Sequence, residues 1–199
     1  MTIIEAMKQL LDKDPKIKIL ACAPSNSAAD LLAQKLSDRG TQIIFRLNSL
    51  TRRIGDLPKN LRSFSCINEN EVFAVPPTED LSKFRVVVAT CLSGGVPAGL
   101  GFPRGHFSHI FVDEAGQGKE PELMVPIKSL ASERTNVILA GDNQQLGPIV
   151  QSQLAAGLGL KTSYLARLMD RDIYDLEGQV GGRGITYVSH QLSAFALSD

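Results

Sequence analysis

Short apolar runs recur along the chain, and each one ends at a turn of polar or small residues. They cover residues 16–23, 85–90, 109–113 and 136–140. Runs of this length bounded by turn signals are typical of strands that are buried in a parallel sheet. Residues 41–47 are predicted to form one more strand.

Apolar positions at helical spacing alternate with these strands. The predicted helices cover residues 2–12, a segment ending near 36, about 120–130, and 164–169. Ser25 or Ser27 can cap the second helix, and Pro121 suits the first turn of the third. Strands that alternate with helices predict an α/β domain, with helices flanking a mostly parallel sheet.

Two stretches fall outside this alternation. Residues 48–84 are polar, and Pro58, Pro76 and Pro77 interrupt any long element, so this segment is predicted to be an irregular insertion. Residues 94–105 are rich in Gly and Pro and are predicted to be a loop.

In open parallel sheets, ligands bind beyond the carboxyl ends of the strands. The polar residues of this chain gather there, in segments 24–27, 90–95, 113–117 and 141–148. We therefore expect one face of the domain to carry its function.

Composition narrows the class of protein. The chain has 199 residues, 43% apolar and 21% charged, which is typical of one soluble globular domain. Lysine plus arginine equals aspartate plus glutamate at 21 each, so bulk charge gives no support to nucleic-acid binding. Three widely spaced cysteines fit neither a disulfide framework nor a zinc site, and no apolar run approaches a membrane span. A reduced cytosolic or nuclear compartment is the simpler interpretation.

The acids Asp113 and Glu114 end a buried strand. Carboxylates in this place are costly unless a cation or a proton transfer uses them. In phosphoryl-transfer motors such an acid holds Mg²⁺, and its neighbour orients the attacking water. The alternative is that the pair only caps the following loop, and the dipeptide by itself does not decide between them.

Three other strand ends carry polar motifs. Residues 139–148 (Leu-Ala-Gly-Asp-Asn-Gln-Gln-Leu-Gly-Pro) place glutamines where they can sense a γ-phosphate, or form a plain hydrogen-bonded turn. Residues 23–30 (Ala-Pro-Ser-Asn-Ser-Ala-Ala-Asp) suit phosphate or sugar contacts, or an N-cap alone. Residues 89–94 offer a similar surface.

These four motifs together resemble superfamily 1 RNA helicases of the Upf-like class in order and spacing. The form Asp113-Glu-Ala-Gly116, followed by Glu120-Pro-Glu122, is similar to the Moloney leukaemia virus 10 homologue, Armitage and plant silencing-defective group. The resemblance covers about residues 2–175. It implies a RecA-like P-loop NTPase fold, here the first motor domain, which moves 5′ to 3′ on single-stranded RNA and unwinds duplexes.

The resemblance also implies roles for single residues. Asp113 would hold Mg²⁺, Glu114 would be the general base, and Gln145 would contact the γ-phosphate of ATP. The implied nucleotide-binding set is Asp113, Glu114, Asp142 and Gln145. The implied RNA-binding set is Pro24, Ser25, Asn26 and Thr90. A monomer without membrane contact is expected, and the group's role in RNA-mediated silencing implies a cytoplasmic location, ribonucleoprotein granules and Argonaute-type partners.

The chain departs from the family at both ends. No Gly-x-x-x-x-Gly-Lys-[Ser/Thr] occurs, and the family's phosphate loop and its central strand would precede Thr2. We expect residues 1–186 to be a partial motor domain, the tail 187–199 to be non-homologous, and the chain to come from a partial gene product, with a dedicated short form as the alternative. Loss of a central strand is expected to expose two unpaired edges. The polypeptide alone is expected to hydrolyse ATP very poorly.

Two other functions stay open at this point. One is a non-catalytic RNA-binding or partner-binding fragment, and the other is a DNA-directed helicase relative. Arg52, Arg53 and Arg62 could touch phosphates, although a solvated loop is the preferred interpretation. His106, His109 and Cys91 are interpreted as structural residues, because no partner for metal binding or nucleophilic chemistry is evident nearby.

Overall fold

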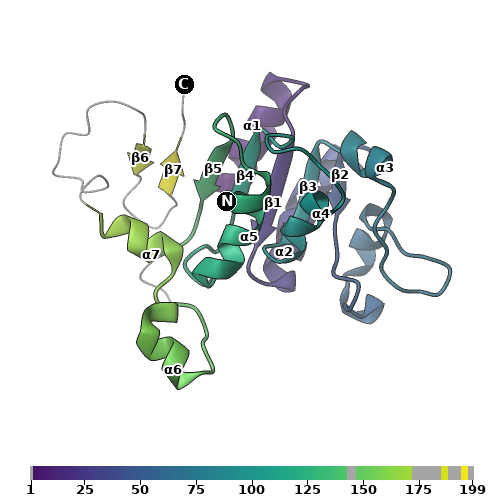
Figure 1. The fold of residues 1–199 in the computed structure, drawn as a ribbon. Helices are drawn as coiled ribbons and strands as arrows, with labels where there is room; N and C mark the ends of the chain where they lie inside the picture. The colour runs from purple at the N-terminus through teal and green to yellow at the C-terminus, as the bar shows by residue number, and fades with distance from the viewer. Residues whose placement is uncertain (1, 143–146, 172–184, 188–193, 197–199) are drawn as a thin grey trace.

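A parallel sheet of five strands forms the centre of the computed structural model, which describes residues 2–142, 147–171, 185–187 and 194–196. The strands are β1 (Ile19–Ala23), β2 (Ile44–Arg46), β3 (Val86–Thr90), β4 (His109–Val112) and β5 (Asn136–Leu139), in the spatial order β2-β3-β1-β4-β5 (Figure 1). All five predicted strands are confirmed. β1 and β2 begin three residues later than predicted, at Ile19 and Ile44.

The register brings the carboxyl ends of the strands to one edge. Ala23 lies opposite Thr90, and Val112 lies between Cys22 and Leu139. The loops that follow these strands therefore emerge side by side, as the sequence predicts. Because β1 pairs with both β3 and β4, the five described strands form a sheet without a gap, and its outer strands are β2 and β5. The expectation that a lost strand exposes unpaired edges stays a prediction.

Helices cover both faces of the sheet. One face carries α1 (Thr2–Lys13), α2 (Asn26–Leu36) and the 3-10 helix η3 (Lys59–Phe64). The other carries α3 (Thr78–Lys83), α4 (Val96–Gly99) and α5 (Glu120–Leu130). Alternate strand residues enter the two cores, so that Ala21 faces the first and Leu20 the second. The predicted RecA-like α/β architecture with flanking helices is confirmed.

Local sequence explains the first two helices. Ile3, Met7 and Leu11 recur every four residues and are buried on one stripe of α1, which ends at Lys13 before Pro15. The hydroxyl oxygen of Ser25 accepts a hydrogen bond from the backbone N–H of Ala28 at 3.2 Å, so Ser25 is the N-cap of α2.

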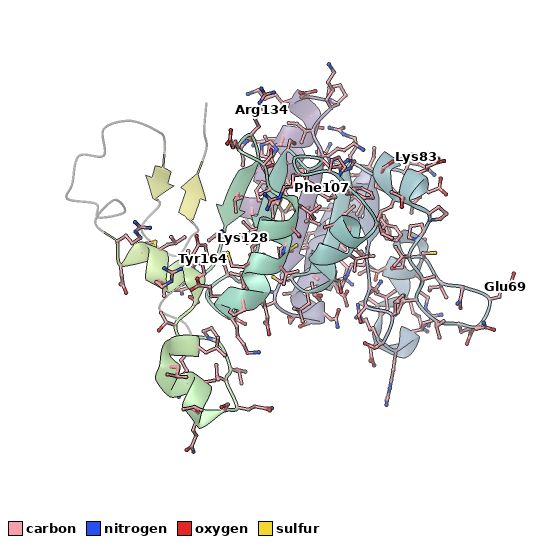
Figure 2. All side chains as sticks on the ribbon, in the orientation of Figure 1. Glu69, Lys83, Phe107, Lys128, Arg134 and Tyr164 are labelled. Carbon is pink, nitrogen blue, oxygen red and sulfur yellow. The ribbon has the colours of Figure 1, made fainter. Side chains whose placement is uncertain are left out.

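The segment 48–84 is more ordered than the predicted irregular insertion. It contains η2 (Ile54–Asp56), η3 and α3, and it buries Leu57, Leu61, Phe64, Phe73 and Leu81. Pro58 and Pro77 stand at the N-caps of η3 and α3, so these prolines begin helical turns and do not only interrupt them. Figure 2 shows Glu69 at the tip of the exposed loop between η3 and α3.

The predicted loop 94–105 also contains helical turns, η4 (Ser93–Gly95) and α4, with Pro97 in the first turn of α4. Figure 2 shows Phe107, the fully buried residue that follows this segment, close to the sheet. The segment is therefore a compact part of the second core.

The last described elements lie beyond β5 (Figure 1). They are α6 (Gln153–Ala155), the π-helical turn η5 (Ala156–Leu160), α7 (Tyr164–Met169), β6 (Ile185–Tyr187) and β7 (Ala194–Ala196). Arg167 pairs with Glu120, which ties the predicted helix α7 to α5. β6 pairs with β7 in antiparallel fashion across the predicted boundary at residue 186, and β7 lies beside β5. None of the helices in the described part of the chain is long and apolar enough to cross a membrane.

Candidate functional site

A groove of about 590 Å³ opens at the carboxyl edge of the sheet. It is lined by Pro24, Ser25, Asn26, Ser49, Thr51, Arg52, Arg53, Asp56, Thr90, Cys91, Leu92, Ser93 and Glu122. All four residues predicted to contact RNA are among them. We call this cavity the strand-end groove.

Local hydrogen bonds position the hydroxyl groups of the strand-end groove. The Ser25 hydroxyl caps α2 and also lies 3.0 Å from the hydroxyl of Ser27. The Thr90 hydroxyl accepts from the backbone N–H of Ser93 at 3.2 Å and donates to its side chain at 3.1 Å. The N-cap interpretation of the motif at 23–30 is therefore confirmed for Ser25, which also lines the groove, while its contact with phosphate or sugar stays a prediction.

Sequence reasoning underestimated the segment 49–53. Arg52 is not solvated, because its side chain is only 5% exposed and pairs with Asp30. Arg53 is exposed at the rim of the strand-end groove, whereas Arg62 is exposed elsewhere and does not line it. The segment 49–53 forms one wall of the strand-end groove, and its only sequence signal was a mixture of hydroxyl and basic residues.

The acid pair follows β4 on the same edge of the sheet. One carboxylate oxygen of Asp113 accepts the backbone N–H of Glu114 at 3.1 Å, and the Glu114 carboxylate accepts the side-chain amide of Gln117 at 2.9 Å. Glu114 has a φ of +52°, in the left-handed region that non-glycine residues seldom occupy. Strained backbone of this kind clusters at functional sites, which favours the functional interpretation of the pair over a plain cap.

The electrostatic environment of the pair is suited to a cation. Burial raises the pKa of Asp113. Burial also raises the pKa of Glu114, and the nearby charges of Asp113 and Asp142 raise it further. Within the described ranges, neither member of the pair forms an ion pair with lysine or arginine. A divalent cation would relieve this repulsion between carboxylates.

These residues fit Mg²⁺ better than a metal held by a full protein cage. Among the described residues, no three histidine, cysteine, aspartate or glutamate side chains gather in a way that could hold a metal. Mg²⁺ takes one or two carboxylates and completes its shell with water and substrate phosphates. Asp142 is near enough to influence Glu114, whereas Gln145 lies outside the described residues.

Two glycines bring the loops of the site into contact. A side chain at Gly118 would meet Leu123 at 2.0 Å and Pro24 at 3.0 Å, so glycine lets the acid loop approach the loop after β1 without displacing Leu123. A side chain at Gly141 would lie 2.9 Å from the backbone nitrogens of Ala115 and Gly116. The acid pair and the strand-end groove therefore belong to one packed set of loops.

A second cavity, of about 630 Å³, adjoins the strand-end groove. It is lined by Pro24, Ser25, Gln117, Lys119, Glu122, Gly147 and Ile149. Pro24, Ser25 and Glu122 line both cavities. Gln117 also donates to Glu114, so this second cavity extends from the loop after β1 towards the acid pair.

The remaining reactive side chains match their predicted structural roles. Burial raises the pKa of the Cys91 thiol to about 12, so it is not a thiolate nucleophile near neutral pH. His109 is buried at the opposite edge of the sheet, where its Nδ1 lies 2.9 Å from the hydroxyl of Ser108. His106 packs between Phe102 and Phe107.

Comparisons with known proteins support the motifs. The "Putative helicase mov-10-B.1" of Danio rerio is 42% identical over 184 residues, which cover 90% of this chain and 18% of that protein. The human "RNA helicase Mov10l1" is 38% identical over 91% of this chain and 15% of its own length. For the "Probable RNA helicase armi" of Drosophila melanogaster the identity is 37%, over 87% of this chain and 16% of that protein. The chain thus spans less than a fifth of the length of these relatives.

The C-terminal part of the Fun30 ATPase domain is a solved structure that aligns with 86% of this chain and 52% of its own, with 15% identity. Its TM-score is 0.41, a similarity too slight to support any inference. A family model described as "AAA domain" matches residues 46–153, more than half of the chain. The chain therefore belongs to the AAA domain family, and its predicted resemblance to the Mov10 and Armitage helicases is confirmed.

Proposed function

We propose that the chain is part of the first motor domain of an ATP-dependent RNA helicase and that its strand-end groove binds single-stranded RNA. The observation that carries the proposal is the convergence of Pro24, Ser25, Asn26 and Thr90 on one groove. These residues come from two neighbouring parallel strands and offer small polar groups to a backbone of phosphates and sugars.

The acid pair supplies the hydrolytic half of the proposal. In this proposal Asp113 would hold Mg²⁺, and Glu114 would take the proton from the attacking water. Mg²⁺, when bound, neutralises charge on the β- and γ-phosphates of ATP. The close approach of Gly118 to Pro24 supports a coupling between this pair and RNA, because a shift in the acid loop would press on the groove. Asp142 and Gln145 complete the proposed nucleotide contacts.

The names of the relatives favour RNA as the substrate, because two of them are called RNA helicases. From the resemblance of the sequence motifs to this helicase group, we also infer a role in RNA-mediated silencing in the cytoplasm, in ribonucleoprotein granules, with Argonaute-type proteins as partners. A non-catalytic RNA-binding fragment is the second candidate function, and the lack of a Gly-x-x-x-x-Gly-Lys-[Ser/Thr] run in these residues favours it.

The proposal is tested by fluorescence anisotropy with a labelled single-stranded RNA at low salt. The double substitution Ser25→Ala and Asn26→Ala is expected to weaken RNA binding about tenfold or more, since each lost hydrogen bond to a charged group contributes about 1.5–3 kcal/mol. The matched control is Ser129→Ala, in the last turn of α5.

Three outcomes separate the candidates. Equal RNA affinity in the double variant and the control would contradict the assignment of the strand-end groove. Equal affinity for RNA and for DNA of the same sequence would favour a DNA-directed relative, because only RNA offers a 2′-hydroxyl. RNA binding that Mg²⁺ and ATP do not change would favour the non-catalytic fragment.

A further inference from the structure

A buried ion cluster lies directly behind the strand-end groove. Asp30, in α2, accepts the Nε–H of Arg46 at 2.9 Å and two N–H groups of Arg52 at 2.9 and 2.5 Å. The side chains are 8% exposed for Asp30, 0% for Arg46 and 5% for Arg52. We call these three residues the Asp30 cluster.

The Asp30 cluster joins three segments that are distant in sequence. Arg46 ends β2 and donates to the backbone oxygen of Leu47 at 2.7 Å. Arg52 donates to the Asn48 side chain and to the backbone oxygen of Asp56, both at 2.8 Å. The carboxylate of Asp30 therefore holds α2, which follows the loop after β1, to the opposite wall of the groove.

Arg46 also fixes the orientation of Asn26. One of its terminal N–H groups lies 3.2 Å from the side-chain oxygen of Asn26. Arginine has only donors, so its partner must be the amide oxygen and not the amide nitrogen. The NH₂ group of Asn26 is then free of this contact, and Asn26 lines the groove. The NH₂ group of Asn26 can therefore serve as a hydrogen-bond donor in the groove, which suits a phosphate or ribose oxygen.

The Asp30 cluster carries a net charge of +1, whereas the acids Asp113, Glu114 and Asp142 do not line the strand-end groove. Arg46 and Arg52 share the single carboxylate of Asp30. Glu122 is paired with Lys119, and the exposed Arg53 and Asp56 offset each other at the rim. The Asp30 cluster therefore keeps one unbalanced positive charge behind the wall of the strand-end groove. The Nε–H of Arg52 also has no hydrogen-bond acceptor among the described residues. A polyanion is attracted to such a wall even though the net charge of the chain is zero.

We propose that Asp30, Arg46 and Arg52 are positioning residues for nucleic-acid binding, which turn the amide of Asn26 towards the groove and supply its excess positive charge. This inference rests on the proposed RNA-binding function. Arg46 acts through Asn26, so its effect on RNA affinity depends on the presence of the Asn26 side chain.

A double-mutant cycle tests this dependence in the 199-residue chain, with a labelled single-stranded RNA as the probe. Arg46→Lys keeps the charge but loses the fork that reaches both Asp30 and Asn26. We expect it to weaken RNA binding about threefold or more in the wild-type background and less than about twofold in the Asn26→Ala background. Thermal unfolding of each variant checks that the fold is retained.

Equal weakening in both backgrounds would show that Arg46 is only structural and would overturn the inference, even though RNA still binds. Failure of the wild-type chain to bind RNA would instead overturn the proposed function. If Arg46→Lys does not fold, Asn26→Asp gives the answer, because it keeps an acceptor for Arg46 but removes the NH₂ group. Wild-type affinity in Asn26→Asp would overturn the inference, and binding at least as weak as in Asn26→Ala supports it.

Discussion

Replacing Asp30 with alanine is expected to lower the free energy of unfolding by about 3–5 kcal/mol. The substitution leaves two guanidinium groups, those of Arg46 and Arg52, without a counter-charge in a site that water does not reach. Burial lowers the pKa of Arg46, the charge and the hydrogen bond of Asp30 raise it, and the charge of Arg52 lowers it, so Asp30 stabilises the Arg46 cation. A loss of this size is a large share of the stability of an ordinary domain.

Urea unfolding followed by circular dichroism measures this loss. Asp38→Ala is the matched control, because Asp38 also forms an ion pair, with Lys8 at 2.6 Å, but its side chain is 59% exposed. An exposed pair of this kind contributes at most about 1 kcal/mol. If the two variants lose the same small amount, the Asp30 cluster is not the buried anchor that its geometry indicates.

Substituting glutamine for Glu114 is expected to lower kcat about 10²–10⁴-fold in any polypeptide that contains this chain and hydrolyses ATP. Glutamine keeps the size of the side chain and its contact with Gln117 but cannot accept a proton from water. Steady-state phosphate release measures the change. Glu133→Gln, in the exposed turn after α5, is the matched control and is expected to leave kcat within about twofold.

The same Glu114→Gln substitution is expected to raise the melting temperature at neutral pH. Because the folded pKa of Glu114 is raised, the folded state holds more protons than the unfolded state between the ordinary and the raised pKa. Stability therefore falls as pH rises through that window, and removing the charge restores it. A lower melting temperature in the variant would contradict the claim that the charge of Glu114 destabilises the folded protein.

The 199-residue polypeptide itself is expected to hydrolyse ATP very poorly, since its sequence contains no Gly-x-x-x-x-Gly-Lys-[Ser/Thr] to grip the phosphates. Turnover that RNA stimulates and Glu114→Gln abolishes would contradict that expectation.

The regular part of the fold was predictable because its signals are local. The strands are runs of apolar residues that enter two cores, and α5 begins at Glu120 and ends at Leu130 as the spacing predicts. Segment 48–84 was not predictable in the same way. Its short helical turns follow Pro58 and Pro77, and they are stabilised by burying Leu61 and Leu81 against the sheet, which is tertiary packing.

The residues that line the candidate site were predictable from the sequence, but the buried ion cluster that holds them in position was not. Pro24, Ser25, Asn26 and Thr90 follow strand ends, so parallel topology alone brings them together. The Asp30 cluster joins partners 16 and 22 residues apart, and no periodic pattern marks it. One signal was present, because Arg46 is the only charged residue in the predicted strand 41–47, and a charge in a buried strand needs a buried partner.

The RNA-binding role of the strand-end groove is tested most directly by photo-cross-linking the 199-residue chain to single-stranded RNA that contains 4-thiouridine, followed by peptide mass spectrometry. We predict cross-links in residues 24–26, 49–53 and 90–93, which line the groove. Cross-links confined to the opposite edge of the sheet, such as residues 104–109 or 132–136, would contradict the proposal that this groove binds RNA.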